Sequence, residues 1–299
     1  MNYLQHLLIY FSIYATLAMS LNIVVGYCGL LSLAHAGYFA IGAYAYAIGT
    51  LCLNLDTFSA TLLAFCAGGI MSLLISLPTW RLKGEYFIMA SMAVQVLIYS
   101  AAYNWFNSSA KLGTLTNMTN GPFGIAGISR PVFFGIKLTS LTSMCLFSLA
   151  LAAIFLGVCH LLLKSPWGRV LQCMRDDELV TRNLGKKIQF LKVQALFIAS
   201  AMAAVAGAVY ASYTSYISPS LASMDQSILL LSMILVGGVC NLRGPLVGAA
   251  VLLLIPEILR FIHIPDPIAS SARVMLYGLL LVLMVRFKPF GLAGNQKIS

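Results

Sequence analysis

Long apolar stretches separated by shorter polar connections make up most of this chain of 299 residues. A helix needs roughly 20 mostly apolar residues to cross the hydrocarbon core of a membrane, where its backbone hydrogen bonds must all be made internally. The pattern predicts an all-α, polytopic membrane protein with eight or nine transmembrane helices, forming a single domain over residues 1–299. The predicted segments lie at about 4–25, 31–53, 58–77, 86–103, 138–163, 193–216, 227–240, 245–262 and 273–286.

The basic residues of the connections predict the topology. Residues 164–192 contain seven Lys and Arg, which predicts that this connection is cytoplasmic by the positive-inside rule. Alternation of the segments then places residues 104–137 on the extracytoplasmic side and the C-terminus in the cytoplasm. If all nine segments cross, the N-terminus lies outside. The sequence leaves open whether residues 227–262 cross fully or re-enter.

Composition agrees with a membrane protein and excludes several other classes. Residues are 60% hydrophobic and only 9% charged, against roughly 25% charged in a soluble domain. The net charge of +10 comes mainly from basic residues in the connections between apolar segments. The sequence has no basic stretch with interleaved aromatic residues, so nucleic-acid binding is not predicted. The seven cysteines include no CxxC pair and the four histidines are scattered, so neither a disulfide framework nor a metal site is predicted.

Two regions interrupt the apolar pattern with glycine, at residues 26–42 and 237–248. Glycine-broken segments in two halves of a transporter can mark a repeat with a substrate site at its interface. Glycine also allows helices to approach closely, and the sequence leaves both interpretations open. Under the first, the candidate residues of the translocation path are His35, Gly37, Gly237, Gly238 and Gly244.

Small residues recur every four positions in the segment at 193–216, at Ala199, Ala203, Gly207 and Ala211. Such a face lets neighbouring helix backbones come close and gain dispersion contacts in lipid. We interpret it as a packing face, with a substrate surface as the alternative.

The sequence contains no chemistry for independent catalysis. No GxxxxGK[ST] loop is present, so ATP hydrolysis by this chain is not expected. Glu85 follows Arg81 and Lys83 near a segment end, and Glu257 lies three residues before Arg260, which predicts structural ion pairing. A self-sufficient secondary transporter, which normally needs a functional charge inside the membrane, is therefore the less favoured alternative. A membrane-embedded enzyme is not supported.

The connection at 164–192 is too long for a tight turn. Ser165 before Pro166 fits a helix N-cap, Asp176 and Asp177 suit the start of a second helix, and Gly185 suits its end. One or two short helices are therefore expected on the membrane face. From these features alone they could be plain surface helices or a docking element for a soluble partner.

The same connection carries a family resemblance. GRVLQCMRDDELVTRNLG, at 168–185, resembles the cytoplasmic loop of ABC-importer permeases for branched-chain amino acids, in which a Glu is followed seven residues later by Gly. Glu178 and Gly185 keep that spacing, whereas Leu179 and Val180 replace the usual alanines. Four further stretches are similar to the M-type subunit of these systems: GLLSLAHAGYFAIGAYAYA, RLKGEYFIMASMA, TNGPFGI and the region from AGAVYASY to GPLVGA.

The resemblance implies a bacterial inner-membrane complex. Its partners would be a second, H-type permease subunit, two ATP-binding subunits that hold ATP and magnesium, and an extracytoplasmic binding protein. The substrate would be a branched-chain amino acid, or urea or a short-chain amide, which related importers carry. Coupling to the ATPases would involve a cytoplasmic coupling helix with Arg175, Asp176, Asp177, Glu178, Arg182 and Gly185.

Overall fold

The computed structural model describes residues 2–79, 82, 84–114, 116–133, 136–137, 140–261, 266–288 and 291–293. Eleven α-helices lie within these ranges, and nine of them coincide one for one with the predicted apolar segments. The fold is all-α, as predicted. The nine helices are α1 (Asn2–Asn22), α2 (His35–Leu51), α3 (Thr57–Thr79), α4 (Glu85–Asn104), α5 (Leu141–Lys164), α8 (Ile188–Thr214), α9 (Met224–Gly237), α10 (Arg243–Phe261) and α11 (Asp266–Phe287).

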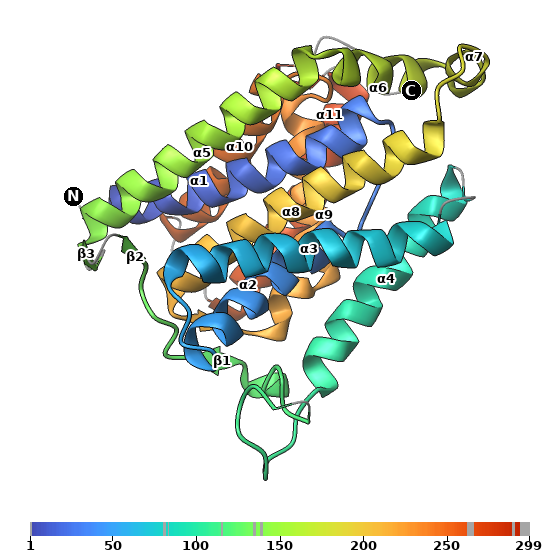
Figure 1. Cartoon of the computed structure of the whole chain (residues 1–299). Coiled ribbons are helices and arrows are strands. Elements are labelled where there is room, and N and C mark those ends of the chain that lie inside the picture. Colours follow the sequence, from blue (N-terminus) through green and yellow to red (C-terminus); the bar gives the residue numbers. More distant parts are fainter. Residues whose placement is uncertain are drawn as a thin grey trace.

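Two further helices occupy the basic connection. α6 (Pro166–Asp176) and α7 (Glu178–Asn183) follow α5 and lead into α8. Both lie across one end of the bundle, as Figure 1 shows in yellow-green at the top. The one or two surface helices expected from the sequence are therefore two.

Five of the described helices are long and apolar enough to cross a membrane. The corresponding spans are Tyr3–Tyr27, Thr57–Leu74, Glu85–Asn104, Leu141–Lys164 and Ile188–Thr214. The 14 residues of α9 extend about 21 Å, less than the ~30 Å of a hydrocarbon core. The number of full crossings stays a prediction.

α8 lies at the centre of the bundle and packs most extensively against α2 and α3. In the most apolar stretch of α8, 83% of the residues are buried, whereas in that of α5 only 17% are. Small residues on the facing surfaces of α2 and α8 explain how closely these two helices pack. A Cβ on Gly42 would lie 2.1 Å from the carbonyl oxygen of Ala204, and one on Gly207 would lie 2.1 Å from that of Phe39.

The connections at one end of the bundle form two-residue strands. β1 (Ile125–Ala126) pairs antiparallel with β4 (Tyr216–Ile217), with Ile125 opposite Ile217. β2 (Val132–Phe133) pairs with β3 (Ile136–Lys137) in a hairpin. The 3₁₀ turns η2 (Gly121–Phe123) and η3 (Pro219–Ala222) lie in the same connections. The pairing of β1 with β4 ties the long loop before α5 to the loop after α8.

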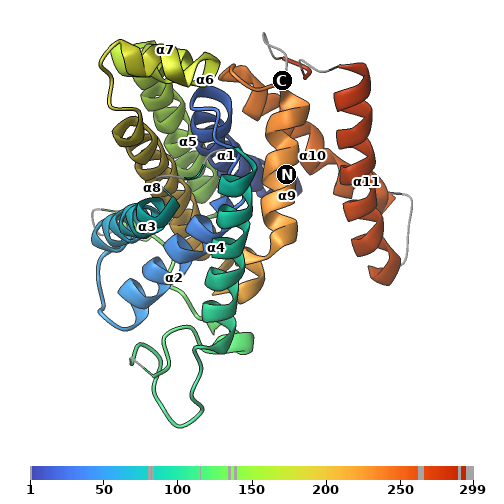
Figure 2. The same cartoon turned by 90° about the vertical axis from the view of Figure 1, so that its right-hand side faces the viewer.

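The opposite end of the bundle, which we call the coupling end, carries α6 and α7. There α1 continues into a π-helical turn, η1 (Ile23–Tyr27), and the α9–α10 connection lies beside it. The chain segment after α11 returns to the same place, where the amides of Leu292 and Ala293 donate to the carbonyls of Val236 and Gly237 at the end of α9. Figure 2 shows α9, α10 and α11 on one side of the bundle, with α11 outermost.

Candidate coupling segment and translocation cavity

Local sequence explains where α7 begins and ends. The Asp177 carboxylate accepts from the amides of Leu179 and Val180, at 2.8 and 3.0 Å, and so caps the first turn. Gly185 adopts φ +75°, a conformation that glycine adopts at little cost, just after the helix ends. Pro166 occupies the first turn of α6, as expected. The Ser165 hydroxyl, in contrast, donates back to the carbonyl of Leu162 and does not cap α6.

α7 presents apolar side chains outward. Leu179, Val180 and Leu184 are 66%, 54% and 70% exposed, whereas Thr181 between them is buried. These three side chains lie in a connection with seven basic residues, which the positive-inside rule predicts to be cytoplasmic. An exposed apolar cluster of this kind is typical of a protein interaction site.

Charged side chains join α7 to its surroundings. Glu178 Oε2 lies 3.1 Å from Lys192 Nζ, which links the start of α7 to the first turns of α8. Asp176 and Arg182 are exposed at the surface of this segment. The structure thus places Asp176, Asp177, Glu178, Arg182 and Gly185 together on one outer surface of the coupling end.

Arg175 differs from these residues because its side chain points inward and is only 17% exposed. Its Nη1 donates to the Gly26 carbonyl at 2.9 Å and contacts Cys240 Sγ. Its Nε and Nη2 donate to the neighbouring Asp176 carboxylate at 3.0 and 2.6 Å. Arg175 therefore joins α6 to both glycine-broken regions of the sequence.

The first glycine-broken region packs tightly. His35 is buried, with Nε2 at 2.7 Å from the hydroxyl of Ser20, and its ring lies edge-on to Tyr38. The Gly37 amide donates to Gln95 Oε1 at 2.8 Å, and a Cβ at this position would overlap that side chain. The His35 ring and the Gly37 amide thus both have hydrogen-bond partners within the bundle. Their participation in the translocation path stays a prediction.

The second glycine-broken region forms the crossing of α9 and α10. A Cβ on Gly237 would lie 1.9 Å from the Gly244 carbonyl oxygen, and one on Gly244 would lie 2.0 Å from that of Gly238. Gly238 itself adopts φ +106°. Close backbone approach accounts for Gly237 and Gly244, and the positive φ accounts for Gly238, without a ligand; the place of these glycines in the path also stays a prediction.

The small-residue face of α8 is buried along its length. Ala199, Ala203 and Ala211 are at most 1% exposed, and Gly207 fits against the backbone of α2 at Phe39 and Ala43. Gly68 on α3 similarly approaches Ser200 and Ala204. The face is thus buried against α2 and α3, and the choice between packing face and substrate surface stays a prediction.

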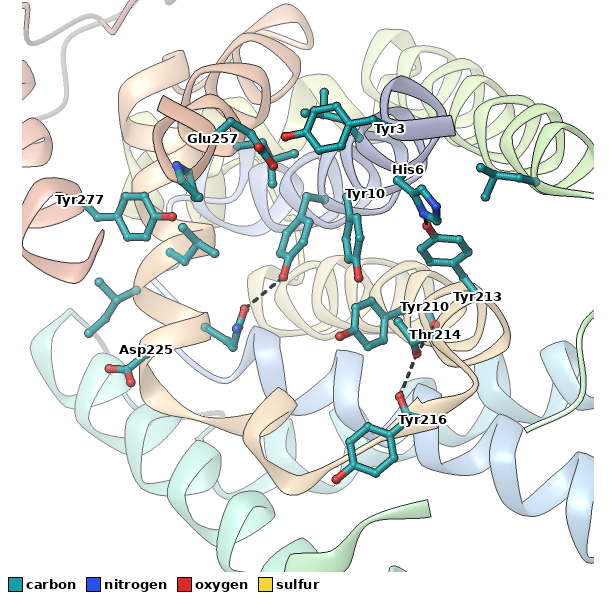
Figure 3. A pocket seen from close by; sticks show the side chains of 18 of the residues that line it. Tyr3, His6, Tyr10, Tyr210, Tyr213, Thr214, Tyr216, Asp225, Glu257 and Tyr277 are labelled. Carbon is teal, nitrogen blue, oxygen red and sulfur yellow. Dashed lines mark hydrogen bonds between the residues drawn. The ribbon is translucent and has the colours of Figure 1, made fainter. Parts of the chain in front are cut away.

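A cavity of about 1070 Å³ opens toward the end of the bundle opposite the coupling end. Its lining residues come from α1, α5, α8, α9, α10 and α11, and Figure 3 shows tyrosine side chains pointing into it from several of these helices. Its volume is at the upper end of that of ligand pockets, roughly 300–1,000 Å³. The tyrosines that line it are Tyr3, Tyr10, Tyr14, Tyr210, Tyr213, Tyr216 and Tyr277.

The cavity combines aromatic surface with charge of both signs. Arg130 from the loop between α4 and α5, Asp225 at the start of α9 and Glu257 on α10 all line it. His6 Nδ1 is hydrogen-bonded to the Tyr213 hydroxyl across the gap between α1 and α8. Phenolic and charged groups around an apolar wall suit a small solute that has both polar and apolar parts.

Little in the sequence indicated this cavity, because its residues come from six helices and two connections that are far apart along the chain. Glu257 was expected to pair locally with Arg260, whose side chain lies outside the described residues, as do Arg81 and Lys83 beside Glu85. One available signal was the abundance of tyrosine, 14 residues in all, of which Tyr3, Tyr213 and Tyr216 stand at the ends of apolar segments.

Comparison with known proteins identifies the family of this chain. Residues 3–285 match the family described as branched-chain amino acid transport system permease component. The chain belongs to this family. It is a permease subunit of an amino-acid importer family, and the resemblance noted from its loop sequences is confirmed.

Three relatives illustrate the similarity. A high-affinity branched-chain amino acid transport system permease protein LivM of Salmonella typhimurium is 27% identical over 94% of this chain and 67% of its own length. A probable branched-chain amino acid transport permease protein LivM of Methanocaldococcus jannaschii is 25% identical over 98% and 93%. An autoinducer 2 import system permease protein LsrC of Salmonella paratyphi B is 29% identical over 48% and 41%. The similarity over nearly the full chain is to M-type subunits, as the sequence motifs indicated.

Proposed function

We propose that this chain is the M-type subunit of an ATP-driven importer that moves branched-chain amino acids across the bacterial inner membrane. It works with an H-type permease subunit, two ATP-binding subunits that hold ATP and magnesium, and an extracytoplasmic binding protein. Full-length similarity to the LivM proteins supports this substrate class and these partners. The coupling end and the C-terminus face the cytoplasm in this proposal, in accord with the seven basic residues at 164–192.

The exposed apolar surface of α7 is the observation that best supports energy supply by separate ATPase subunits. Leu179, Val180 and Leu184 are exposed in a connection that contains seven basic residues. An ATP-binding subunit that covers them gains hydrophobic contact. The Glu178–Lys192 pair then passes any displacement of α7 on to α8.

The cavity of seven tyrosines is the proposed entry for the substrate. It opens at the end of the bundle that receives the binding protein in this topology, and it contains both cationic and anionic side chains. A zwitterion with an aliphatic side chain matches these groups. The same groups also accommodate urea or a short amide, so the substrate has to be assigned by transport.

Reconstitution tests the proposal. The chain is purified with a co-expressed H-type subunit and ATPase subunits, placed in liposomes, and supplied with its binding protein. We expect ATP-dependent uptake of leucine, isoleucine or valine in preference to urea, acetamide and other amino acids. If the complex took up urea or acetamide but none of the branched-chain amino acids, urea or the amide would be assigned as the substrate instead. Gradient-driven uptake by this chain without ATPase subunits would overturn the proposal in favour of a secondary transporter.

A further inference from the structure

The Arg175 side chain makes contacts that docking of a partner does not require. The outer surface of α6 and α7 offers several charged groups, yet this guanidinium lies inward and is mostly covered. It forms hydrogen bonds with two chain segments that are 149 and 65 positions away in the sequence. A planar guanidinium with five N–H donors can serve several acceptors at once, whereas a lysine ammonium cannot keep that fixed geometry.

The first acceptor is a carbonyl at the end of α1. The turn η1 has π-helical hydrogen bonds, for example from the amide of Cys28 to the carbonyl of Ile23. The last carbonyls of a helix lack helical partners and carry partial negative charge, which favours a cation there. The Gly26 carbonyl takes Arg175 Nη1 and also the Cys240 thiol, at 2.9 Å each.

The second contact is with the connection between α9 and α10. Cys240 has φ +66°, an uncommon conformation for a residue with a side chain, and its sulfur lies between Arg175 and Gly26. The adjacent Asn241 carbonyl accepts from the Asn22 amide group at 3.1 Å. Arg175, η1 and the α9–α10 connection therefore form one bonded cluster.

Glycine at position 29 makes room for this arrangement. Gly29 has φ +73°, and a Cβ there would lie 2.6 Å from Cγ of Arg175 and 3.3 Å from its Cβ. A side chain at position 29 would thus be strained in itself and would also push Arg175 out of place. This glycine, which lies in the first glycine-broken region, leaves space for the side chain of Arg175.

The two segments held by Arg175 lead directly to the cavity. α1 runs from the Arg175 contact at Gly26 to Tyr3 and His6 in the cavity wall, and α9 runs from Gly237 back to Asp225 in the same wall. The helix α1 is about 30 Å long at 1.5 Å per residue. Both are single helices that can shift as rigid elements.

We infer that Arg175 is the positioning residue that transmits displacement of α6 to the cavity, through η1 and α1 on one side and the α9–α10 connection on the other. The inference rests on the proposed function, because the ATP-binding subunits supply the displacement. ATP-driven movement of α6 carries the Gly26 carbonyl and Cys240 with it. The α1 and α9 walls of the cavity then move together, which changes access to the substrate.

The test measures leucine uptake and ATP hydrolysis in the same liposomes, with the complete complex and its binding protein. Arg175→Ala should leave the subunits co-purifying and ATP hydrolysis running, while leucine transported per ATP falls at least about tenfold, within the usual range of site-to-site coupling. Arg175→Lys should lie between Arg175→Ala and the wild type. Arg286→Ala, which removes an exposed arginine at the end of α11, should change nothing.

A second variant disturbs the same contact without removing the charge. Gly29→Ala should lower the ratio of transport to hydrolysis as Arg175→Ala does, and the double variant should be no worse than either single one. Gly157→Ala, at a helical position with open space, is the matched control.

An unchanged ratio in Arg175→Ala or Gly29→Ala would overturn the inference. Loss of the ATPase subunits from the Arg175→Ala or Arg175→Lys complex would also overturn it, since Arg175 would then serve docking. Absence of ATP-dependent leucine uptake by the wild-type complex would instead count against the proposed function.

Discussion

Single glycines decide how closely the helices of this bundle approach. The sequence left open whether its glycines serve a substrate path or helix packing. At Gly42, Gly207 and Gly237 the next backbone lies where a Cβ would be, so at these positions a close crossing explains the residue type. The sequence could not show this, because nothing in it states which carbonyl lies opposite which glycine.

Replacing Gly42 by valine should destabilise the folded chain. The added Cβ would overlap the Ala204 carbonyl and force α2 and α8 apart, which costs about 1–3 kcal/mol or more as overpacking does. Thermal unfolding of the purified protein in detergent should show a lower Tm. Gly157→Val adds the same side chain to α5 in open space and is the control. Equal Tm shifts for the two variants would contradict the close crossing.

Gln95 shows a polar contact that the sequence analysis missed. It lies buried within an apolar segment, and such a polar residue commonly bonds another helix. Its Oε1 accepts from the Gly37 amide at 2.8 Å and its Nε2 donates to the Ala222 carbonyl at 2.6 Å. Its presence in an apolar segment was a usable signal, but its partners, 58 and 127 positions away, were not predictable.

Gln95→Leu should therefore weaken the contact between α2, α4 and η3. The Ala222 carbonyl loses its bond within the bundle, at a cost of about 1–3 kcal/mol. Detergent or thermal denaturation followed by fluorescence should detect the loss. Gln189→Leu alters an exposed glutamine at the start of α8 and should leave the transition in place. A Gln95→Leu protein as stable as the wild type would rule out a structural role for this bond.

At the scale of elements, hydropathy predicted the helices well. Each of the nine apolar segments became one helix, and charge and capping residues identified the connection that forms α6 and α7. The π-helical turn after α1 and the pairing of β1 with β4 were not predicted. Two-residue strands carry no periodicity, and a π turn depends on partners, such as Arg175, that belong to another element.

The surface of α7 yields the prediction for this scale. Leu184→Glu places a charge in the exposed apolar cluster and should reduce co-purification of the ATPase subunits at least about tenfold, as loss of an interface anchor does. Glu178→Gln, which weakens the link to Lys192, should keep the subunits bound while lowering uptake per ATP hydrolysed. Lys288→Glu changes charge at the same end outside α7 and serves as the control. Normal co-purification with Leu184→Glu would show that the ATPases bind elsewhere.

For the whole molecule, the connections gather at two ends of the bundle. The α6–α7 segment and the α9–α10 connection lie at one end and the β1–β4 pair lies at the other, while the membrane side that each end faces stays a prediction. The cavity, by contrast, exists only in the assembled bundle. It draws on residues from Tyr3 to Tyr277, and no spacing along the chain predicts that these meet.

Membrane sidedness is testable with two single cysteines. In a background in which the exposed Cys66 and Cys173 are replaced by serine, Arg182→Cys should react with a membrane-impermeant maleimide only from the cytoplasmic side. Ser109→Cys, in the loop at the opposite end, should react only from outside. Mass-tag shifts on intact and permeabilised cells measure both. Reaction of Arg182→Cys from outside would invert the topology.

The return of residues 291–293 to the end of α9 also has a consequence for how the protein is made. The carbonyls of Val236 and Gly237 accept from the amides of Leu292 and Ala293. The Asn241 side chain donates to the Ala293 carbonyl, which comes 52 positions later in the chain. During translation, the bonds at this end of α9 cannot form until those last residues have left the ribosome. A chain that stops at residue 290 would contain all the described helices but would lack the hydrogen bonds that residues 292 and 293 make to the end of α9 and to Asn241.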